Sequence, residues 1–339
     1  MEKLKIGIIG AGRIGKVHTE TIIQNVPEAE VVYIADVNLD EAKNLAERFR
    51  IKNYSNNHKD IIDDTEINAV IICSPTNTHA QYIVEAAKAK KHIFCEKPID
   101  LDLEIIENAI KVVEENNVKL MVGFNRRFDS NFKKIKQMVF EGKIGEPHIL
   151  KITSRDPAPP SPEYSAVSGG MFLDMTIHDF DMARYIVGSE IEEVYAIAGV
   201  MIDEKIGEAG DVDTALITLK FVNGAMGVID NSRKAVYGYD QRVEIFGSKG
   251  MLKVDNNAPD NHKYYSEIGV HASLPLNFFM DRYIEAYASE IDEFCQAIIN
   301  DKPISVGGID GLLAVAIGKA AKLSVNEKRP VKIAEIWNK

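Results

Sequence analysis

The sequence is short of cysteine, of positive charge and of long apolar runs, and each shortage excludes a class of protein. Its 339 residues contain only three cysteines, Cys73, Cys95 and Cys295. We expect these to be thiols rather than a disulfide framework, in a reducing, cytoplasmic compartment. The formal net charge of −11 disfavours nucleic acid and anionic membranes as general partners. We find no signal peptide or membrane-spanning run, and therefore expect no membrane partner.

Metal-binding motifs are also lacking, as are internal repeats and low-complexity tracts. The sequence contains no HExxH-type motif and no cysteine-based ligand set, so we predict no metal. What remains is an ordinary globular composition, with 45% hydrophobic and 27% charged residues. Because 339 residues are many for one hydrophobic core, we expect two domains, 1–124 and 125–339.

The most informative pattern that is present lies in the first forty residues. An apolar run, Leu4 to Ile9, leads into the glycine motif Gly10-Ala11-Gly12-Arg13-Ile14-Gly15, and a second apolar run ends at Asp36. Strand, glycine turn, helix, strand and acid together predict a dinucleotide site. Gly10 permits the tight turn, Gly12 leaves room for a pyrophosphate at the helix N-terminus, and Gly15 lets the helix pack closely. Asp36 suits a ribose 2′-OH and would repel a 2′-phosphate, which favours NAD over NADP. The alternative is a glycine-rich turn of an unrelated α/β protein.

The two halves of the chain differ in their hydrophobic patterns. In the first half short apolar runs such as Ala69–Cys73 and His92–Cys95 alternate with helical patterns, which predicts a doubly wound parallel sheet of an α/β protein. The second half has longer, alternating runs, which predict an α+β domain on a large open, mainly antiparallel sheet. One of these runs, Ala225–Asp230, is apolar on both faces. We therefore expect self-association through this sheet, as a homo-oligomer and most simply a tetramer.

Three polar groups follow predicted strands or begin a predicted helix. They are Ser74-Pro75-Thr76-Asn77 with His79, Glu96-Lys97-Pro98, and Asp174-x-x-x-His178. Ligands of open α/β sheets bind at the carboxyl ends of the strands. Asp174 and His178 are four residues apart, so on one helix they would share a face, and a carboxylate there could orient a histidine that accepts a proton. They could equally form a helix ion pair or a pair of metal ligands, and Lys97 could be a surface lysine.

The glycine motif, Glu96-Lys97-Pro98 and Asp174-x-x-x-His178, in this order, resemble the Gfo/Idh/MocA oxidoreductase family over essentially the whole chain. The resemblance implies an N-terminal Rossmann domain, an open mixed-sheet domain and assembly through that sheet. It assigns catalysis to Lys97, Asp174 and His178, with Lys97 and His178 contacting the reacting hydroxyl. It also implies a cis peptide bond between Lys97 and Pro98. The residues that it assigns to the cofactor are Gly10, Gly12, Arg13, Ile14, Gly15, Asp36, Ser74, Pro75, Asn77, His79, Glu96 and Lys97.

Two further segments, Ser154–Pro160 and Gly169–Asp181, resemble the inositol dehydrogenases of that family. The resemblance implies oxidation of a ring hydroxyl of a cyclitol or sugar, with NAD as the acceptor. It places Lys97, Asp174 and His178 at the substrate, and the further residues that it assigns to the polyol pocket are Arg127, Arg155, Asp156, Tyr237 and Tyr283. Three alternatives stay open: a dehydrogenase for another sugar or polyol, a non-catalytic sensor of NAD or sugar, and an NAD-dependent glycosidase.

Overall fold

The computed structural model describes residues 3–338, apart from the side chain of Ala166, and divides into two compact units. The first unit holds the chain up to Phe128 together with Glu285–Val315. The second unit holds Asp129–Ile284 and the chain from Ala316 onward. The sequence predicts one boundary, at residue 124, whereas in the structure a C-terminal segment returns to the first unit.

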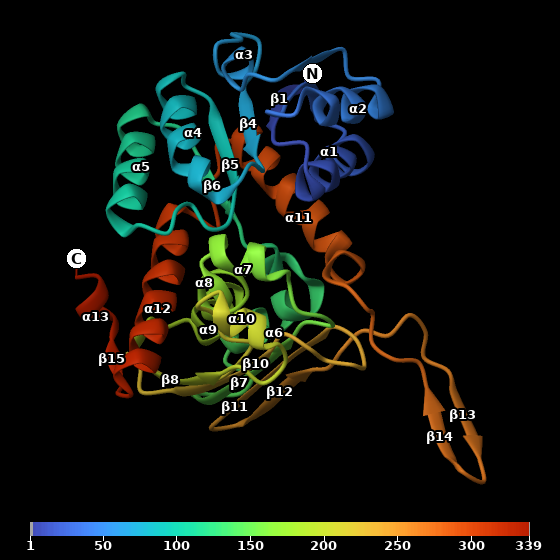
Figure 1. Cartoon of the computed structure of the whole chain (residues 1–339), viewed down its shortest axis with the longest axis vertical. Coiled ribbons are helices and arrows are strands. Elements are labelled where there is room, and N and C mark those ends of the chain that lie inside the picture. The colour runs from blue at the N-terminus through green and yellow to red at the C-terminus, as the bar shows by residue number, and fades with distance from the viewer. Residues whose placement is uncertain (1–2, 339) are drawn as a thin grey trace. The chain divides into compact units, whose positions relative to one another are not determined.

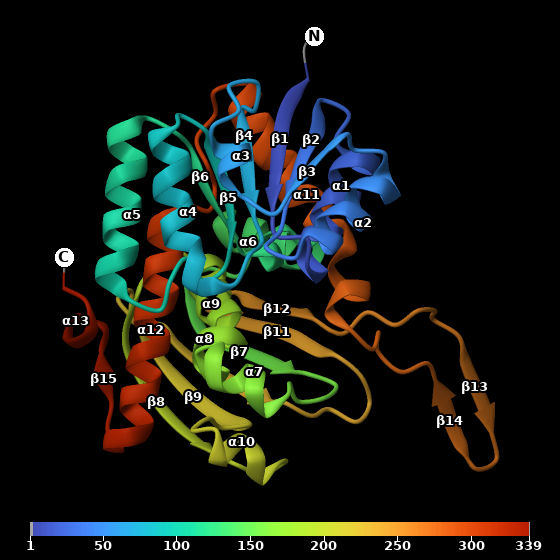
Figure 2. The ribbon, with the colours of Figure 1, turned by 45° about the horizontal axis from the view of Figure 1, so that its top comes forward.

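The first unit is built on a six-stranded sheet in the order β3-β2-β1-β4-β5-β6, and all neighbouring strands are parallel. Helices α1 and α2 lie on one side of this sheet, and α4 and α5 lie on the other (Figure 2). Because both faces are covered, the central strands are mainly apolar, and Ile6, Ile8 and Ile71 are fully buried. The predicted doubly wound α/β fold is confirmed. The strands are β1 (Leu4–Ile9), β2 (Ala29–Ala35), β3 (Asn53–Ser55), β4 (Ala69–Ile72), β5 (His92–Glu96) and β6 (Leu120–Gly123).

Local sequence signals set the ends of several helices in this unit. The Asn38 side chain accepts a hydrogen bond from the Asp40 N–H and begins α2, and Asp102 begins α5 in the same way. α2 ends where Arg50 adopts a left-handed conformation, with φ = 59°. The helices are α1 (Arg13–Asn25), α2 (Leu39–Phe49), α3 (Lys59–Ile62), α4 (Thr76–Lys88), α5 (Leu103–Asn116) and the 3₁₀ turn η1 (Asn125–Phe128).

The second unit is built on a seven-stranded sheet in the order β12-β11-β7-β10-β9-β8-β15. Every neighbouring pair is antiparallel except β10 with β7, so the predicted open, mainly antiparallel sheet is confirmed. A turn at Asn223-Gly224 joins β9 to β10, and Gly224 has the positive φ, +88°, that favours glycine. The strands are β7 (Pro147–Arg155), β8 (Ile191–Gly199), β9 (Thr214–Phe221), β10 (Met226–Ser232), β11 (Asp240–Gly247), β12 (Gly250–Val254) and β15 (Val331–Lys332).

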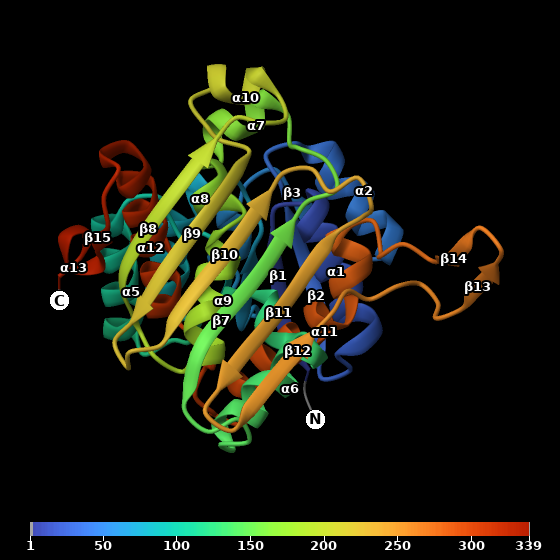
Figure 3. The same ribbon diagram turned by 90° about the horizontal axis from the view of Figure 1, so that it is seen from below.

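The two faces of the second sheet differ in what covers them. One face is buried, and α9 packs on it at β7. The strand register places four exposed side chains in one row across the other face. In Figure 3 no helix crosses the near face of strands β7 to β10. This apolar row spans the strands β12, β11, β7 and β10 and consists of Met251, Phe246, Ile149 and Met226.

The remaining elements of the second unit include a hairpin, β13 with β14, that projects away from the seven-stranded sheet (Figure 1). Helices α11 and α12 each have residues in both units. Within residues 3–338, no helix has the length and apolar character needed to cross a bilayer. These elements are α6 (Ser130–Phe140), α7 (Pro162–Val167), α8 (Gly170–Asp174), α9 (Ile177–Val187), α10 (Glu204–Glu208), β13 (Lys263–Ser266), β14 (Gly269–Ala272), α11 (Phe279–Ile299), α12 (Gly308–Glu327) and α13 (Ile333–Ile336).

Candidate active site

The turn between β1 and α1 has the geometry that its three glycines predict. Gly10 has a φ of +106°, and a Cβ atom there would lie 2.6 Å from the carbonyl carbon of Cys73. A Cβ on Gly15 would lie 1.9 Å from the carbonyl oxygen of Gly10. By contrast, a Cβ on Gly12 would meet no described atom within 4 Å. Gly10 and Gly15 are therefore required by the fold, whereas Gly12 keeps open the space in front of the helix.

This space has the features that a dinucleotide requires. α1 begins after Gly12 with no side-chain cap and no acidic residue in its first turn, so its N-terminal N–H groups are available to a phosphate. The Asp36 carboxylate, one residue beyond β2, accepts hydrogen bonds from the N–H groups of Ala11 at 2.7 Å and Asn38 at 2.8 Å. These bonds fix an acidic group beside the glycine turn. The residues present thus fit NAD, with Gly12 and α1 suited to its pyrophosphate and Asp36 to its ribose.

The loop that follows β4 contains the next expected cofactor residues. Pro75 is the N-cap of α4, Asn77 lies in its first turn, and Ser74 Oγ lies 2.7 Å from Thr78 Oγ1. His79 is buried, and its Nδ1 and Nε2 lie 2.8 Å from the Pro98 carbonyl oxygen and 2.7 Å from that of Ser74. Burial lowers the pKa of His79, against the opposing effect of these carbonyl contacts. In the structure His79 therefore connects two loops, a role that the sequence does not reveal.

The segment Glu96-Lys97-Pro98 ends β5, which is the neighbour of β4 in the sheet. The Lys97–Pro98 peptide bond is cis, as the family resemblance implies. Because β1, β4 and β5 are adjacent and parallel, their carboxyl ends lie at the same edge of the sheet. The first unit therefore brings the glycine turn, the Ser74 loop and Lys97 to one edge, where open α/β sheets bind ligands.

The second unit carries Asp174 and His178, but on two helices instead of one. α8 ends at Asp174, and α9 begins at Ile177. The expectation of a single continuous helix through both residues is therefore wrong. Thr176, between them, donates its hydroxyl to the Asn231 side chain at 2.7 Å, and Asn231 in turn donates to Asp179 at 2.9 Å. The buried contact between Thr176 and Asn231 on β10 thus lies at the break between α8 and α9.

The Asp174 carboxylate has two partners that the sequence did not indicate. It accepts hydrogen bonds from Arg233 Nη2 and from the Tyr164 hydroxyl, each at 3.1 Å. The same guanidinium reaches Asp156 with Nη1, also at 3.1 Å. Burial lowers the pKa of Arg233, but the two carboxylates more than compensate and raise it. Arg233 thus holds two of the expected substrate residues, Asp156 and Asp174, together.

A second charged network in this unit contains Arg155 and Tyr237. Arg155 donates from Nε to Asp230 at 3.0 Å and from Nη1 to the Tyr237 hydroxyl, also at 3.0 Å. Tyr237 in turn donates to Asp240 at 2.5 Å. Burial and the Asp240 carboxylate raise the pKa of Tyr237, so it remains a neutral hydroxyl group. Such groups can donate and accept hydrogen bonds at a polyol.

The two remaining residues expected at the substrate are buried and already in contact with other side chains. Tyr283 lies at a kink in α11, with its ring 6.0 Å from that of Tyr239. Arg127, in the first unit, donates from Nη2 to Asp310 at 2.9 Å. The assignment of both residues to a polyol pocket stays a prediction.

Comparison with known proteins gives matches over nearly the whole chain. The model described as an oxidoreductase family with an NAD-binding Rossmann fold, Gfo/Idh/MocA, matches residues 4–124. The model of the Gfo/Idh/MocA C-terminal domain matches residues 132–253. Myo-inositol 2-dehydrogenase of Thermotoga maritima is 49% identical, covering 98% of this chain and 99% of that protein. Inositol 2-dehydrogenase of Rhizobium meliloti is 45% identical, with the same coverage.

The chain is also similar to a protein whose solved structure contains bound ligands. The crystal structure of scyllo-inositol dehydrogenase from Lactobacillus casei, with bound NAD(H) and scyllo-inositol, is 32% identical and has a TM-score of 0.92. The match covers 98% of this chain and 100% of that one.

Proposed function

The chain belongs to the Gfo/Idh/MocA family of NAD-binding oxidoreductases, and from that premise we propose that it oxidises myo-inositol at one ring hydroxyl, giving 2-keto-myo-inositol. The observation that carries the proposal is the 45–49% identity, over 98% of the chain, to relatives named for that activity. The charged networks around Arg233 and Arg155 support it, because a substrate with many hydroxyls needs many positioned polar groups.

Oxidation of a CH–OH group requires removal of a hydride from carbon and a proton from oxygen. NAD, when bound, supplies the hydride acceptor. His178 accepts the hydroxyl proton as general base. Asp174, held by Arg233 and Tyr164, orients His178 and stabilises the imidazolium that forms. Lys97 donates a hydrogen bond to the reacting oxygen and stabilises its developing negative charge. These roles for Lys97, Asp174 and His178 follow from the family resemblance.

We further propose that the protein works in the cytoplasm as a homotetramer. Cys73, Cys95 and Cys295 are free thiols, as expected in a reducing compartment. The apolar row Met251, Phe246, Ile149 and Met226 on the open sheet gives a surface for a second copy of the chain.

The experiment is to mix the protein with NAD⁺ and a panel of polyols and to follow the absorbance of NADH. Steady NADH formation with myo-inositol supports the proposal. Preference for scyllo-inositol would assign the chain to the activity of its Lactobacillus casei relative. Cleavage of glycosides without NADH accumulation would indicate a glycosidase, and binding without turnover a sensor. Either of these last two results would contradict the proposal.

A further inference from the structure

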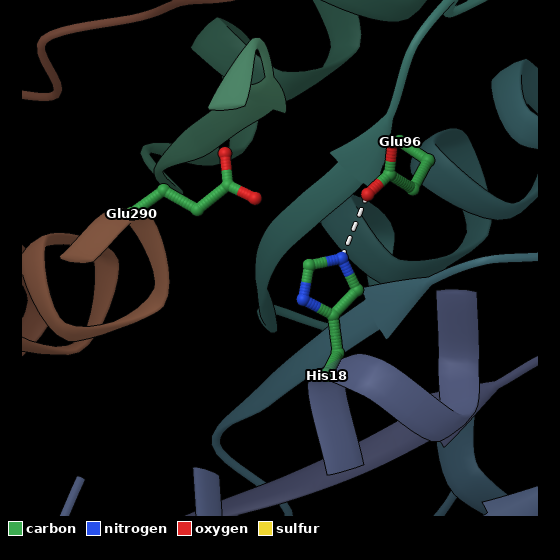
Figure 4. A group of neighbouring side chains, drawn as sticks. All are labelled: His18, Glu96 and Glu290. Carbon is green, nitrogen blue, oxygen red and sulfur yellow. Dashed lines mark hydrogen bonds and ion pairs between the residues drawn. The ribbon is translucent and has the colours of Figure 1, made fainter. Parts of the chain in front are cut away.

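Three ionisable side chains meet inside the first unit, next to the segment that carries Lys97. They are His18 on α1, Glu96 at the end of β5 and Glu290 on α11, and one polar atom of each lies within 4.8 Å of the others. His18 and Glu290 are completely buried. Figure 4 shows the carboxylate of Glu290 pointing toward the space beside the His18 ring and the Glu96 carboxylate. We call these three residues the buried cluster.

The position of Glu96 within the buried cluster is strongly constrained. Its Oε1 lies 2.7 Å from His18 Nε2. The His18 ring is itself held edge-to-face between Phe94 and Tyr287, with centroid distances of 5.1 and 5.7 Å. On the neighbouring strand β6, Gly123 pairs with Glu96, and a Cβ atom there would lie 3.0 Å from Glu96 Oε2. The glycine leaves just enough room for the carboxylate.

Glu290 differs from Glu96 because no side chain or backbone group satisfies it. Neither of its carboxylate oxygens has a hydrogen-bond partner within the described part of the chain. The ionisable groups near it include His18, Glu96 and the Cys73 thiol, none of which is a permanent cation. Burial, with a further contribution from Glu96, raises the pKa of Glu290 far above its usual range. An ionised Glu290 would place a negative charge next to Glu96 in a site that is closed to solvent.

The buried cluster lies immediately before Lys97 in the chain, and a matching anchor lies immediately after it. His18 fixes Glu96 on the N-terminal side. On the C-terminal side, His79 Nδ1 lies 2.8 Å from the Pro98 carbonyl oxygen. The backbone of Lys97 is thus held between two residues, each in contact with a buried histidine. A displacement of about 1 Å at such a position can cost on the order of a hundredfold in rate.

We propose that His18 is a positioning residue that fixes the Glu96 carboxylate and, through it, the backbone of Lys97, and that Glu290 lies beside this pair as an uncharged acid. The proposal rests on the proposed role of Lys97 in the reaction. A neutral Glu290 adds no charge beside the His18–Glu96 pair. A divalent metal ion would also neutralise these three groups, and the experiments below distinguish the metal from the proton.

The first experiment compares His18→Asn with a matched control, His58→Asn. His58 forms a similar pair in the same unit, with its Nε2 2.7 Å from Glu85 Oε2, but far along the chain from Lys97. We expect His18→Asn to lower kcat at least tenfold while KM for the polyol changes less than threefold, since Lys97 acts as negative charge develops. His58→Asn should keep kcat within twofold. Equal, small effects of the two substitutions on kcat would overturn the proposal.

Combination with Lys97→Ala separates this inference from the proposed function. If His18 acts through Lys97, the double variant Lys97→Ala/His18→Asn should have the kcat of Lys97→Ala alone. If the kcat losses of the two single variants instead multiply in the double variant, His18 acts by another route and the inference is overturned. Wild-type kcat in Lys97→Ala would instead refute the catalytic role of Lys97, whatever His18 does. Should His18→Asn fail to fold, Glu96→Gln, which retains the volume and removes the charge, replaces it in both comparisons.

The second experiment tests the proton on Glu290 through the pH dependence of unfolding. An unfolded glutamate releases its proton near pH 4.3, whereas folded Glu290 retains it to higher pH. The folded wild type therefore loses stability as the pH rises above that value. Relative to Glu290→Gln, its folding equilibrium constant should fall by up to tenfold per pH unit. Parallel stability profiles of the two proteins would show that Glu290 is ionised and would overturn the proposal. Stoichiometric metal in the purified wild type that is lost in His18→Asn would also overturn it.

Discussion

At the scale of single residues, we expect Asp36 to decide which dinucleotide the first unit favours. Its carboxylate is fixed beside the glycine turn by the Ala11 and Asn38 N–H groups, and the next side chain, Val37, is exposed. We predict that Asp36→Ser with Val37→Arg raises kcat/KM for NADP and lowers it for NAD, because a cation replaces the group that repels a 2′-phosphate. The measurement is kcat/KM with both cofactors, with Asp40→Ser as control for loss of an exposed acid. A wild-type preference for NADP would refute this account of Asp36.

Residues with local partners could be predicted from the sequence, whereas residues with distant partners could not. Gly10, Gly15 and Asp36 could be predicted because the turn requires them locally. Arg233 and Glu290 could not, because their partners are distant in the chain: Arg233 contacts Asp156 and Asp174, and Glu290 faces His18 and Glu96. Without an alignment, only the fold shows which arginine or glutamate is buried. His79 was singled out near the cofactor, yet its two carbonyl contacts depend on a neighbouring loop.

At the scale of elements, the β1–α1 turn gives a prediction that contrasts two of its glycines. Gly12→Ala should keep the thermal stability of the protein and weaken NAD binding, since its Cβ meets no described atom and enters the space for the pyrophosphate. Gly15→Ala should lower both, because its Cβ would lie 1.9 Å from the Gly10 carbonyl oxygen. Calorimetry of unfolding and titration with NAD⁺ measure the two effects. Tight NAD binding by Gly12→Ala would show that the pyrophosphate lies elsewhere.

Elements with a strong local pattern were predicted well, and those set by tertiary contacts were not. β4 (Ala69–Ile72) and β5 (His92–Glu96) lie where the apolar runs Ala69–Cys73 and His92–Cys95 predict strands. The break between α8 and α9 has no proline or glycine to mark it, and it coincides with the contact of Thr176 with Asn231. The short hairpin β13–β14 was missed, because its pattern is exposed and irregular.

At the scale of the whole molecule, the open sheet predicts assembly. We expect light scattering at micromolar concentration to give the mass of an oligomer, most simply a tetramer. Phe246→Glu and Met226→Glu should lower that mass, because each places a charge in the apolar row. Ile105→Glu, at an exposed position of α5 in the first unit, is the matched control. A monomeric wild type would refute self-association. Unchanged masses in both sheet variants would show that the interface does not include the apolar row.

The division into units follows from contacts that no local pattern reveals. Residues 285–315 lie in sequence between β12 and β15 of the second sheet but belong to the first unit. There the Val306 carbonyl accepts a hydrogen bond from Val122 on β6, and a Cβ on Gly308 would lie 2.7 Å from Ile110. Such close packing between residues more than 180 positions apart in the chain is a property of the folded structure alone.

In the proposed reaction, this chain removes a hydride and a proton from a cyclitol hydroxyl, with His178 as the base. The most direct test is the pH dependence of NADH formation from myo-inositol by the wild type and by His178→Ala. We predict a wild-type rate that rises with pH as His178 loses its proton. In His178→Ala that rise should disappear and kcat should fall on the order of 10²–10⁴-fold, while NAD⁺ binds as before. Wild-type turnover in His178→Ala would contradict the claim.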